Sequence, residues 1–291
     1  MMTKAEFDNC IRSTFCTYYD IDIFGYQIHD INKTHSNYLN NSSFDRFVSE
    51  MQNNYPDAYK KYIAGKGSEL ISQHRNNIYL PPKMASVASS SRFCYLALRN
   101  GALALGGGCT IDFEHECKIK GIKGTAPQID AYSPDGNIFI EVKCHEIFDK
   151  HTVSLSSQYS EWLFRKDTGF LLPETAEAAG QCSIPLSAFG INKEHTMFDI
   201  KQFLCHLMGI ASQSAEKAEL VYLFFKPQTF DSRTQDQIDE VFKNLTQEIR
   251  TIFTSTPITR FCNTNHITLR AVAQQNYEMT TLTPKNMITL Y

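Results

Sequence analysis

The sequence predicts an α/β fold in which helices pack on a central sheet, and three features indicate it. Residues 220–225 (LVYLFF) form the apolar run that is typical of a strand buried on both faces. The turn signal Pro134-Asp135-Gly136 separates two strand-like segments, which predicts a hairpin. Amphipathic helices are predicted before and after the buried strand. Helices and strands therefore alternate, as in layered α/β domains.

Residues 1–80 are expected to form a mostly helical extension. They are polar and rich in Tyr and Asn, and helical pieces are predicted at 43–51 and 58–71. A further helix is predicted over roughly 88–101, because Ser89 to Ser91 are N-cap candidates and Gly101 can end a helix.

Three strand-like runs follow, at 110–119, 128–133 and 137–144. After the long segment 145–197, an apolar stripe at helical spacing predicts a helix over 198–211. A second amphipathic helix is expected at 232–254 and a further strand at 266–272. From residue 88 onward the predicted order is α-β-β-β-α-β-α-β.

Composition excludes few classes of protein. The 291 residues carry a formal net charge of -3, so binding to nucleic acid would have to rest on a local basic patch. No run approaches the roughly 18 apolar residues of a membrane helix, and the N-terminus lacks the apolar core of a signal peptide. Nine scattered cysteines without a CxxC pattern indicate reduced thiols rather than disulfides. We expect a cytoplasmic protein that does not bind a membrane.

Glu141 and Lys143 are two residues apart in a predicted strand, so they share a face, whereas Val142 faces the other way. An unpaired charge beside an apolar layer costs several kcal/mol. The simplest explanation is a salt bridge between the two side chains.

Asp130, on the partner strand, adds a second explanation that depends on the hairpin register. A two-residue loop places Asp130 directly opposite Glu141, with Cβ atoms roughly 4.5–5.5 Å apart. A three-residue loop with a glycine bulge, the commoner form for Ser-Pro-Asp-Gly, places the two acids on opposite faces. A four-residue loop makes them diagonal neighbours. We predict an even-numbered loop or a compensating bulge in either strand.

Two converging carboxylates without His or Cys favour a hard cation, Mg²⁺ or Mn²⁺, and a phosphate ester as substrate. The metal would polarise the phosphoryl oxygen and acidify a bound water, and Lys143 would orient or deprotonate that water.

Asp130 followed by Glu141-Val142-Lys143 resembles the D-x(n)-E-x-K signature of the PD-(D/E)XK, or restriction endonuclease-like, nuclease superfamily. Gln128-Ile129-Asp130 stands in place of the Pro-Asp of that name. The resemblance covers roughly residues 69–226. It implies an αβββαβ core with a mixed central sheet flanked by helices, within a nuclease-like domain over 81–291 that carries an insertion at about 145–197. It also implies that Asp130, Glu141 and the Val142 backbone carbonyl hold Mg²⁺ while Lys143 assists the attacking water.

Many members of the superfamily carry a further glutamate on the first core helix, but the predicted helix 88–101 has none. Glu69, on the preceding helical piece, ranks just ahead of Glu114 as a candidate, and Glu116 is a third. Gln202 and His206 resemble polar residues that some members direct at the site. A polar helix face with a satisfied histidine explains these two residues equally well.

Three further features each have two interpretations. A zinc site is suggested by Cys144 and His145 together with His115 and Cys117. Their spacing matches no closed zinc module, so the interpretation as ordinary buried cysteines is preferred. The loop lysines either form a solvated face or contact a nucleic-acid backbone; they are Lys118, Lys120 and Lys123. The insertion holds the single Trp, Trp162, and is either a lid or, as preferred, a decorating subdomain.

The expected function is that of a Mg²⁺-dependent endodeoxyribonuclease of restriction, repair or phage-defence type, with a nucleic acid, expected to be DNA, as its partner. A homodimer is expected if both strands are cut. Two alternatives remain: a nucleic-acid-binding or assembly module on the same fold that does not cleave, and a protein of another class in which Glu141 and Lys143 merely pair.

Overall fold

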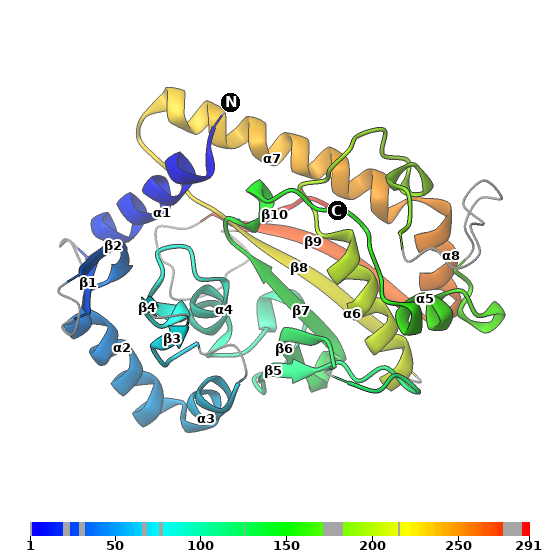
Figure 1. The fold of residues 1–291 in the computed structure, drawn as a ribbon, viewed down its shortest axis with the longest axis horizontal. Coiled ribbons are helices and arrows are strands. Elements are labelled where there is room, and N and C mark those ends of the chain that lie inside the picture. The colour runs from blue at the N-terminus through cyan, green and yellow to red at the C-terminus, as the bar shows by residue number, and fades with distance from the viewer. Residues whose placement is uncertain are drawn as a thin grey trace.

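The computed structural model describes residues 2–19, 24–28, 33–65, 69–75, 78–124, 126–170, 183–214, 216–275 and 287–291. Its centre is a six-stranded mixed sheet in the order β10-β9-β8-β7-β6-β5 (Figure 1). Strands β5, β6 and β7 are antiparallel to one another, β7, β8 and β9 are parallel, and β10 is antiparallel to β9. The strands are β5 (Asp112–Glu116), β6 (Gln128–Ser133), β7 (Ile138–Lys143), β8 (Ala218–Lys226), β9 (Ile267–Gln275) and β10 (Met287–Thr289).

Eight α-helices lie in the described residues, so the predicted α/β class is confirmed. Their bounds are α1 (Lys4–Tyr19), α2 (Asn41–Asn54), α3 (Pro56–Ala64), α4 (Ser90–Leu98), α5 (Ser157–Leu163), α6 (Ile200–Gln213), α7 (Ser232–Phe253) and α8 (Thr256–Thr264). From α4 onward the predicted order of elements is observed, with α5, α8 and β10 in addition. In the described part of the chain, no helix is both long and apolar enough to cross a bilayer.

Helices α4 and α6 cover opposite faces of the sheet. Phe225 of β8 packs against Phe93 of α4, with ring centroids 5.0 Å apart. Tyr222, three residues earlier on the same strand, contacts His206 of α6. Because side chains alternate along a strand, these two contacts lie on opposite faces. The end of α7 joins the α6 layer, where Phe253 stacks on Phe203 at 5.0 Å.

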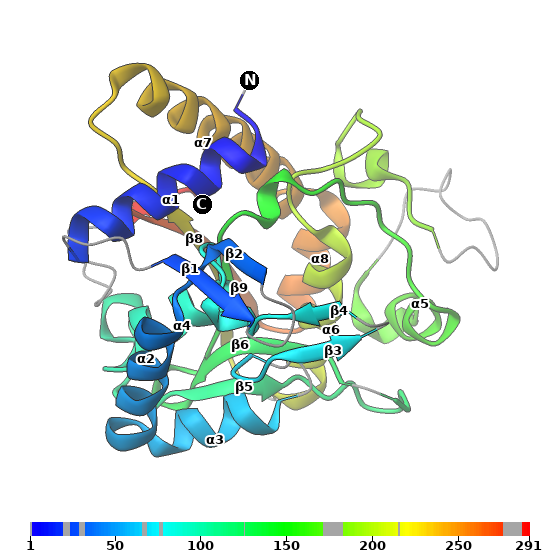
Figure 2. The same cartoon turned by 60° about the vertical axis from the view of Figure 1, so that its left-hand side comes forward.

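The N-terminal region is less helical than expected. Besides α1, α2 and α3 it contains two antiparallel hairpins, which Figure 2 brings to the front. Their strands are β1 (Phe24–Ile28), β2 (Lys33–Leu39), β3 (Gln73–Arg75) and β4 (Ile78–Leu80). The helix predicted over 58–71 ends at Ala64, because Gly65 adopts an extended backbone. Glu69 therefore does not lie on a helix, which corrects its expected setting.

The β6–β7 hairpin has the parity that a shared acidic face requires. Its ladder pairs Ser133 with Ile138 and Ala131 with Ile140, so the connection comprises residues 134–137, an even number. The prediction of an even-numbered loop is thus confirmed. The left-handed residue is Asn137, at φ 49°, instead of Gly136. Continued by one step, this register sets Asp130 directly opposite Glu141, not diagonal to it.

Candidate active site

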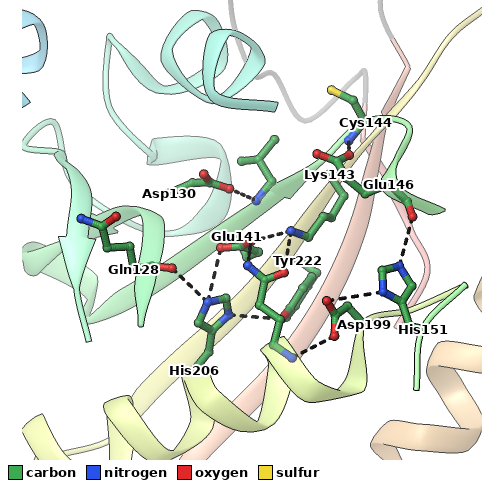
Figure 3. A network of polar contacts seen from close by, with 12 residues as sticks. Gln128, Asp130, Glu141, Lys143, Cys144, Glu146, His151, Asp199, His206 and Tyr222 are labelled. Atoms are coloured by element: carbon green, nitrogen blue, oxygen red, sulfur yellow. Dashed lines mark hydrogen bonds and ion pairs between the residues drawn. The ribbon is translucent and has the colours of Figure 1, made fainter. Parts of the chain in front are cut away.

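Asp130 lies where strands β6 and β7 stop sharing backbone hydrogen bonds. Beyond the Ala131–Ile140 pair, Val142 N–H donates to Asp130 Oδ2 at 2.7 Å. The Asp130 carboxylate thereby reaches the backbone between Glu141 and Lys143, as Figure 3 shows. The hairpin register thus brings together the three residues that the sequence singled out.

Glu141, Lys143 and Gln202 form a closed triangle of polar contacts. Lys143 Nζ donates to Glu141 Oε1 at 2.6 Å and to Gln202 Oε1 at 2.8 Å. The Gln202 amide nitrogen also donates to Glu141 Oε1, at 2.8 Å. The salt bridge expected as the simplest explanation is therefore formed. The suggestion that Gln202 is directed at this cluster agrees with the structure.

The other oxygen of Glu141 is in a different environment. Glu141 Oε2 is buried and has no hydrogen-bond partner among the described residues; we call it the open oxygen of Glu141. His206 Nε2 lies 3.7 Å from it, and the Glu141 side chain is only 3% exposed. A buried carboxylate oxygen without a donor is costly, so a simple salt bridge does not account for this group.

His206 is held as a neutral, buried histidine behind Glu141. Its Nε2 lies 3.1 Å from the Gln128 carbonyl oxygen and its Nδ1 lies 3.2 Å from the Tyr222 hydroxyl. Burial lowers the pKa of His206, against the opposing effect of Glu141. A neutral ring that donates to Gln128 and accepts from Tyr222 satisfies both contacts. His206 therefore links α6 to strands β6 and β8 and fixes the floor of the site.

Glu114 extends the row of acids by one strand. The β5–β6 ladder pairs Phe113 with Ala131 and His115 with Ile129, so Glu114 is opposite Asp130 in this register. Its backbone is left-handed, at φ 51°, a strained conformation for a residue other than glycine. Burial, together with Glu69 and Glu141, raises the pKa of Glu114 to about 7.

Glu69 lies beside this row but has its own partner. It is 7% exposed, and its carboxylate is 3.5 Å from Lys83 Nζ. Burial raises its pKa, while Lys83 acts in the opposite direction. Of the two acids, Glu114 has the more direct position, since it is level with Asp130 on the neighbouring strand and its charge raises the pKa of Asp130. Glu116 is exposed and pairs with Lys118 at 3.4 Å.

Negative charge is concentrated around Lys143. Burial raises the pKa of Asp130 well above its ordinary range, and the neighbouring Glu141 carboxylate raises it further. Burial alone would lower the pKa of Lys143, but nearby acids, Glu141 first, outweigh it and raise that pKa above its ordinary value. Neighbouring carboxylates contribute to both shifts, and an additional cation would offset their charge.

These residues fit a magnesium ion, although no group of three or more His, Cys, Asp or Glu side chains in the described residues is arranged to hold a metal. Mg²⁺ often takes only one or two carboxylates, plus waters and substrate phosphates. Here Asp130 and the open oxygen of Glu141 supply two carboxylate ligands. The N–H and C=O groups of a strand residue point to the same side, so the Val142 carbonyl faces β6 as its N–H does.

The four residues of the zinc alternative form no metal-binding group in the described part of the chain. His115 Nδ1 lies 2.7 Å from Asp112, and His145 Nδ1 lies 2.7 Å from Asp8 of α1. Cys117 packs against Gly209 of α6, where a Cβ on the glycine would come within 2.5 Å of it. The preferred interpretation of buried cysteines agrees with this, since Cys117 and Cys144 are both buried.

The sequence did not single out Asp199, which positions Gln202. Asp199 is the N-cap of α6, and its side chain accepts from Gln202 N at 2.9 Å. An Asp directly before an apolar helical stripe was the signal available. His151 Nδ1 lies 3.5 Å from Asp199, and both residues line a pocket of about 240 Å³ that also borders Lys143. This pocket therefore borders the polar cluster drawn in Figure 3 at Lys143 and Gln202.

The basic loop and the insertion lie next to each other. Lys118, Lys120 and Lys123 are exposed on the connection between β5 and β6. The indole N–H of Trp162, in α5 of the insertion, donates to the Lys120 carbonyl oxygen at 3.1 Å. The Trp162 ring also lies 6.4 Å from that of Phe261 in α8. The described part of the insertion thus packs on the body of the protein.

Comparison with protein-family models, with curated proteins and with solved structures finds no match.

Proposed function

We propose that this protein is a metal-dependent nuclease of the PD-(D/E)XK type that hydrolyses phosphodiester bonds in DNA. One observation carries the proposal: the Asp130 carboxylate accepts from Val142 N–H next to Glu141, whose open oxygen is buried. Two carboxylates, a strand carbonyl and a lysine at one point are the groups that metal-assisted phosphate hydrolysis requires.

The order of elements supports the same proposal. Helix α4, strands β5 to β7, helix α6 and strand β8 follow the αβββαβ order that the resemblance implies. The acids lie on the β6–β7 hairpin, and Gln202 comes from the helix that follows.

In this proposal, Asp130, the open oxygen of Glu141 and the Val142 carbonyl hold Mg²⁺ or Mn²⁺. The bound ion would supply charge neutralisation at the phosphoryl group and a more acidic water. Lys143 orients the attacking water by hydrogen bonding as an ammonium, because the surrounding acids raise its pKa. Gln202 keeps Lys143 and Glu141 in place through its two amide contacts.

Glu114 is our candidate for a further acidic ligand, ahead of Glu69. It lies opposite Asp130 in the register, and its left-handed backbone is the kind of local strain found at functional sites. Glu69 is held by Lys83, so its recruitment would require that ion pair to open. Glu114→Gln should therefore reduce metal affinity more than Glu69→Gln does.

Cleavage assays with the full chain test the proposed function. Plasmid, linear duplex and single-stranded DNA, and RNA, are incubated with Mg²⁺ or with EDTA. Mutation of a residue that only supports a metal ligand typically lowers metal affinity or activity 10–100-fold. We therefore expect the site variants Asp130→Asn, Glu141→Gln and Lys143→Ala each to reduce cleavage by about a hundredfold or more. Asp236→Asn, at an exposed acid on α7, is the matched control.

A module that binds nucleic acid without cleaving it is the second candidate, and the closed triangle of Glu141, Lys143 and Gln202 favours it. That module would bind DNA equally with Mg²⁺ and with EDTA and leave every substrate intact. Cleavage that requires Mg²⁺ and is lost in the three variants would exclude it. If the duplex is cut on both strands, we expect a homodimer, since each strand needs a site.

A further inference from the structure

A pocket of about 290 Å³ lies between the β5–β6 connection and α5. Its apolar walls include Ile119, Ile122 and Pro127, and Tyr159 of α5 contributes an aromatic ring. Lys118 and Glu116 are at its polar edge. This volume is at the small end of ligand pockets, so it admits a single planar group and excludes a duplex.

The insertion builds and braces this pocket. Trp162 is 7% exposed, and its N–H bond to the Lys120 carbonyl oxygen holds the loop against α5. Tyr159 is one turn earlier on the same helix, so the two aromatic rings project toward the same side. The loop is therefore attached to a helix that itself packs on α8, which gives the pocket a preformed wall.

The charge around the pocket is suited to a phosphate backbone. Lys118, Lys120 and Lys123 are exposed on the loop, whereas the net charge of the whole chain is negative. A local basic segment next to an aromatic pocket is the combination that proteins use for single-stranded nucleic acid: lysines contact the phosphates and aromatic rings stack on the bases.

The pocket is within reach of a strand bound at the active site. Pro127 lines the pocket and is three residues from Asp130; at about 3.3 Å per residue the separation is about 10 Å. A stacked strand advances about 3.4 Å per nucleotide, so a base within about three nucleotides of the scissile phosphate can reach the pocket.

We propose that this pocket receives one unpaired nucleobase of the substrate strand, stacked on Tyr159, with the adjoining phosphates on the loop lysines. The inference rests on the proposed function, because the strand that enters the pocket is the one that is cleaved. It makes the substrate a nucleic acid with a single-stranded or extrudable base close to the cut. It also gives the insertion a role, as the element that shapes this base pocket.

Binding can be measured without cleavage, from the fluorescence of Trp162, the one tryptophan of the chain. In EDTA, wild-type protein is titrated with a short single-stranded DNA and with the same strand carrying an abasic site. We expect Tyr159→Ala to weaken binding of the intact strand about tenfold or more, which corresponds to a stacking contact. Tyr159→Phe should retain affinity, and so should Phe164→Ala, a control at an exposed aromatic residue outside the pocket.

The abasic strand separates stacking from charge. Tyr159→Ala should bind the abasic strand as well as wild-type protein does, because the group that Tyr159 contacts is missing. The base pocket is excluded if Tyr159→Ala and Phe164→Ala bind the intact strand equally, or if Tyr159→Ala weakens both strands alike. If binding depends on Tyr159 but Mg²⁺ supports no cleavage, the pocket stands and the nuclease proposal fails. If cleavage occurs but binding does not depend on Tyr159, the nuclease proposal stands and the base pocket is excluded.

Discussion

The two carboxylate oxygens of Glu141 are in different environments. Its Oε1 accepts from Lys143 and Gln202, which fixes the direction of the carboxylate. Its Oε2 is left buried and open toward His206, which is too distant for a hydrogen bond at 3.7 Å. Because leaving a buried acceptor unsatisfied costs about 1–3 kcal/mol, we infer that a bound cation satisfies this oxygen in the working protein.

Glu114 should make the metal-free protein less stable as the pH rises. Its pKa is raised from 4.5 to about 7, chiefly by burial, so the folded state favours the protonated form. That stabilisation is complete below about pH 4.5 and is lost as the pH rises through about 7. In EDTA, the free energy of unfolding of the wild type should fall between pH 5 and pH 8. In Glu114→Gln this fall should be smaller by about 1–3 kcal/mol.

Urea denaturation at the two pH values provides that measurement. Glu116→Gln is the matched control, because Glu116 is an exposed acid on the same strand and should leave the pH dependence unchanged. Identical pH dependence in Glu114→Gln and wild-type protein would show that burial and the neighbouring acids do not raise the pKa of Glu114.

The β6–β7 hairpin is the element on which the site depends, and Asn137 sets its register. This residue is left-handed, and its amide donates to Ser214 Oγ at 2.8 Å and to the Lys217 carbonyl oxygen at 3.0 Å. Asn137→Ala and Asn137→Gly both remove these contacts, but only alanine places a Cβ in a left-handed backbone. We expect Asn137→Ala to be less stable than Asn137→Gly by about 1 kcal/mol in urea denaturation. Equal stabilities would contradict the role assigned to the turn.

The sequence could predict this hairpin but not which residue would be left-handed. Alternating apolar and charged positions around Pro134-Asp135-Gly136 were enough to locate both strands, and the requirement that acids share a face gave the parity. Gly136 is the residue that usually adopts positive φ in such a turn. Asn137 takes that role because its side chain is anchored to the segment before β8, a contact between distant parts of the chain.

Local sequence patterns also did not predict short elements that depend on distant parts of the chain. Strands β3, β4 and β10 are three residues each, too short to show a period of two, and β10 exists by pairing with β9. Helix α8 had a usable signal, since Ser255 is its N-cap and Pro257 is in its first turn. Glu69 was misplaced because Gly65 ends α3 before the acid is reached.

Magnesium should stabilise the whole molecule if the acids bind it. A ligand at a hundred times its dissociation constant adds about 2.7 kcal/mol, which for a protein of this size raises the melting temperature by several degrees. We expect this rise with Mg²⁺ or Mn²⁺ in calorimetry of the wild type. It should be absent in Asp130→Asn and Glu141→Gln and retained in Asp236→Asn. An equal rise in all four proteins would place the metal elsewhere.

A crystal structure of the wild-type protein with Mn²⁺, located by its anomalous signal, tests the proposed metal site. We expect one ion in contact with Asp130, the open oxygen of Glu141 and the Val142 carbonyl, with Lys143 beside a water on that ion. A crystal at saturating Mn²⁺ that shows no anomalous peak there, with the Lys143–Glu141–Gln202 triangle unchanged, would contradict it.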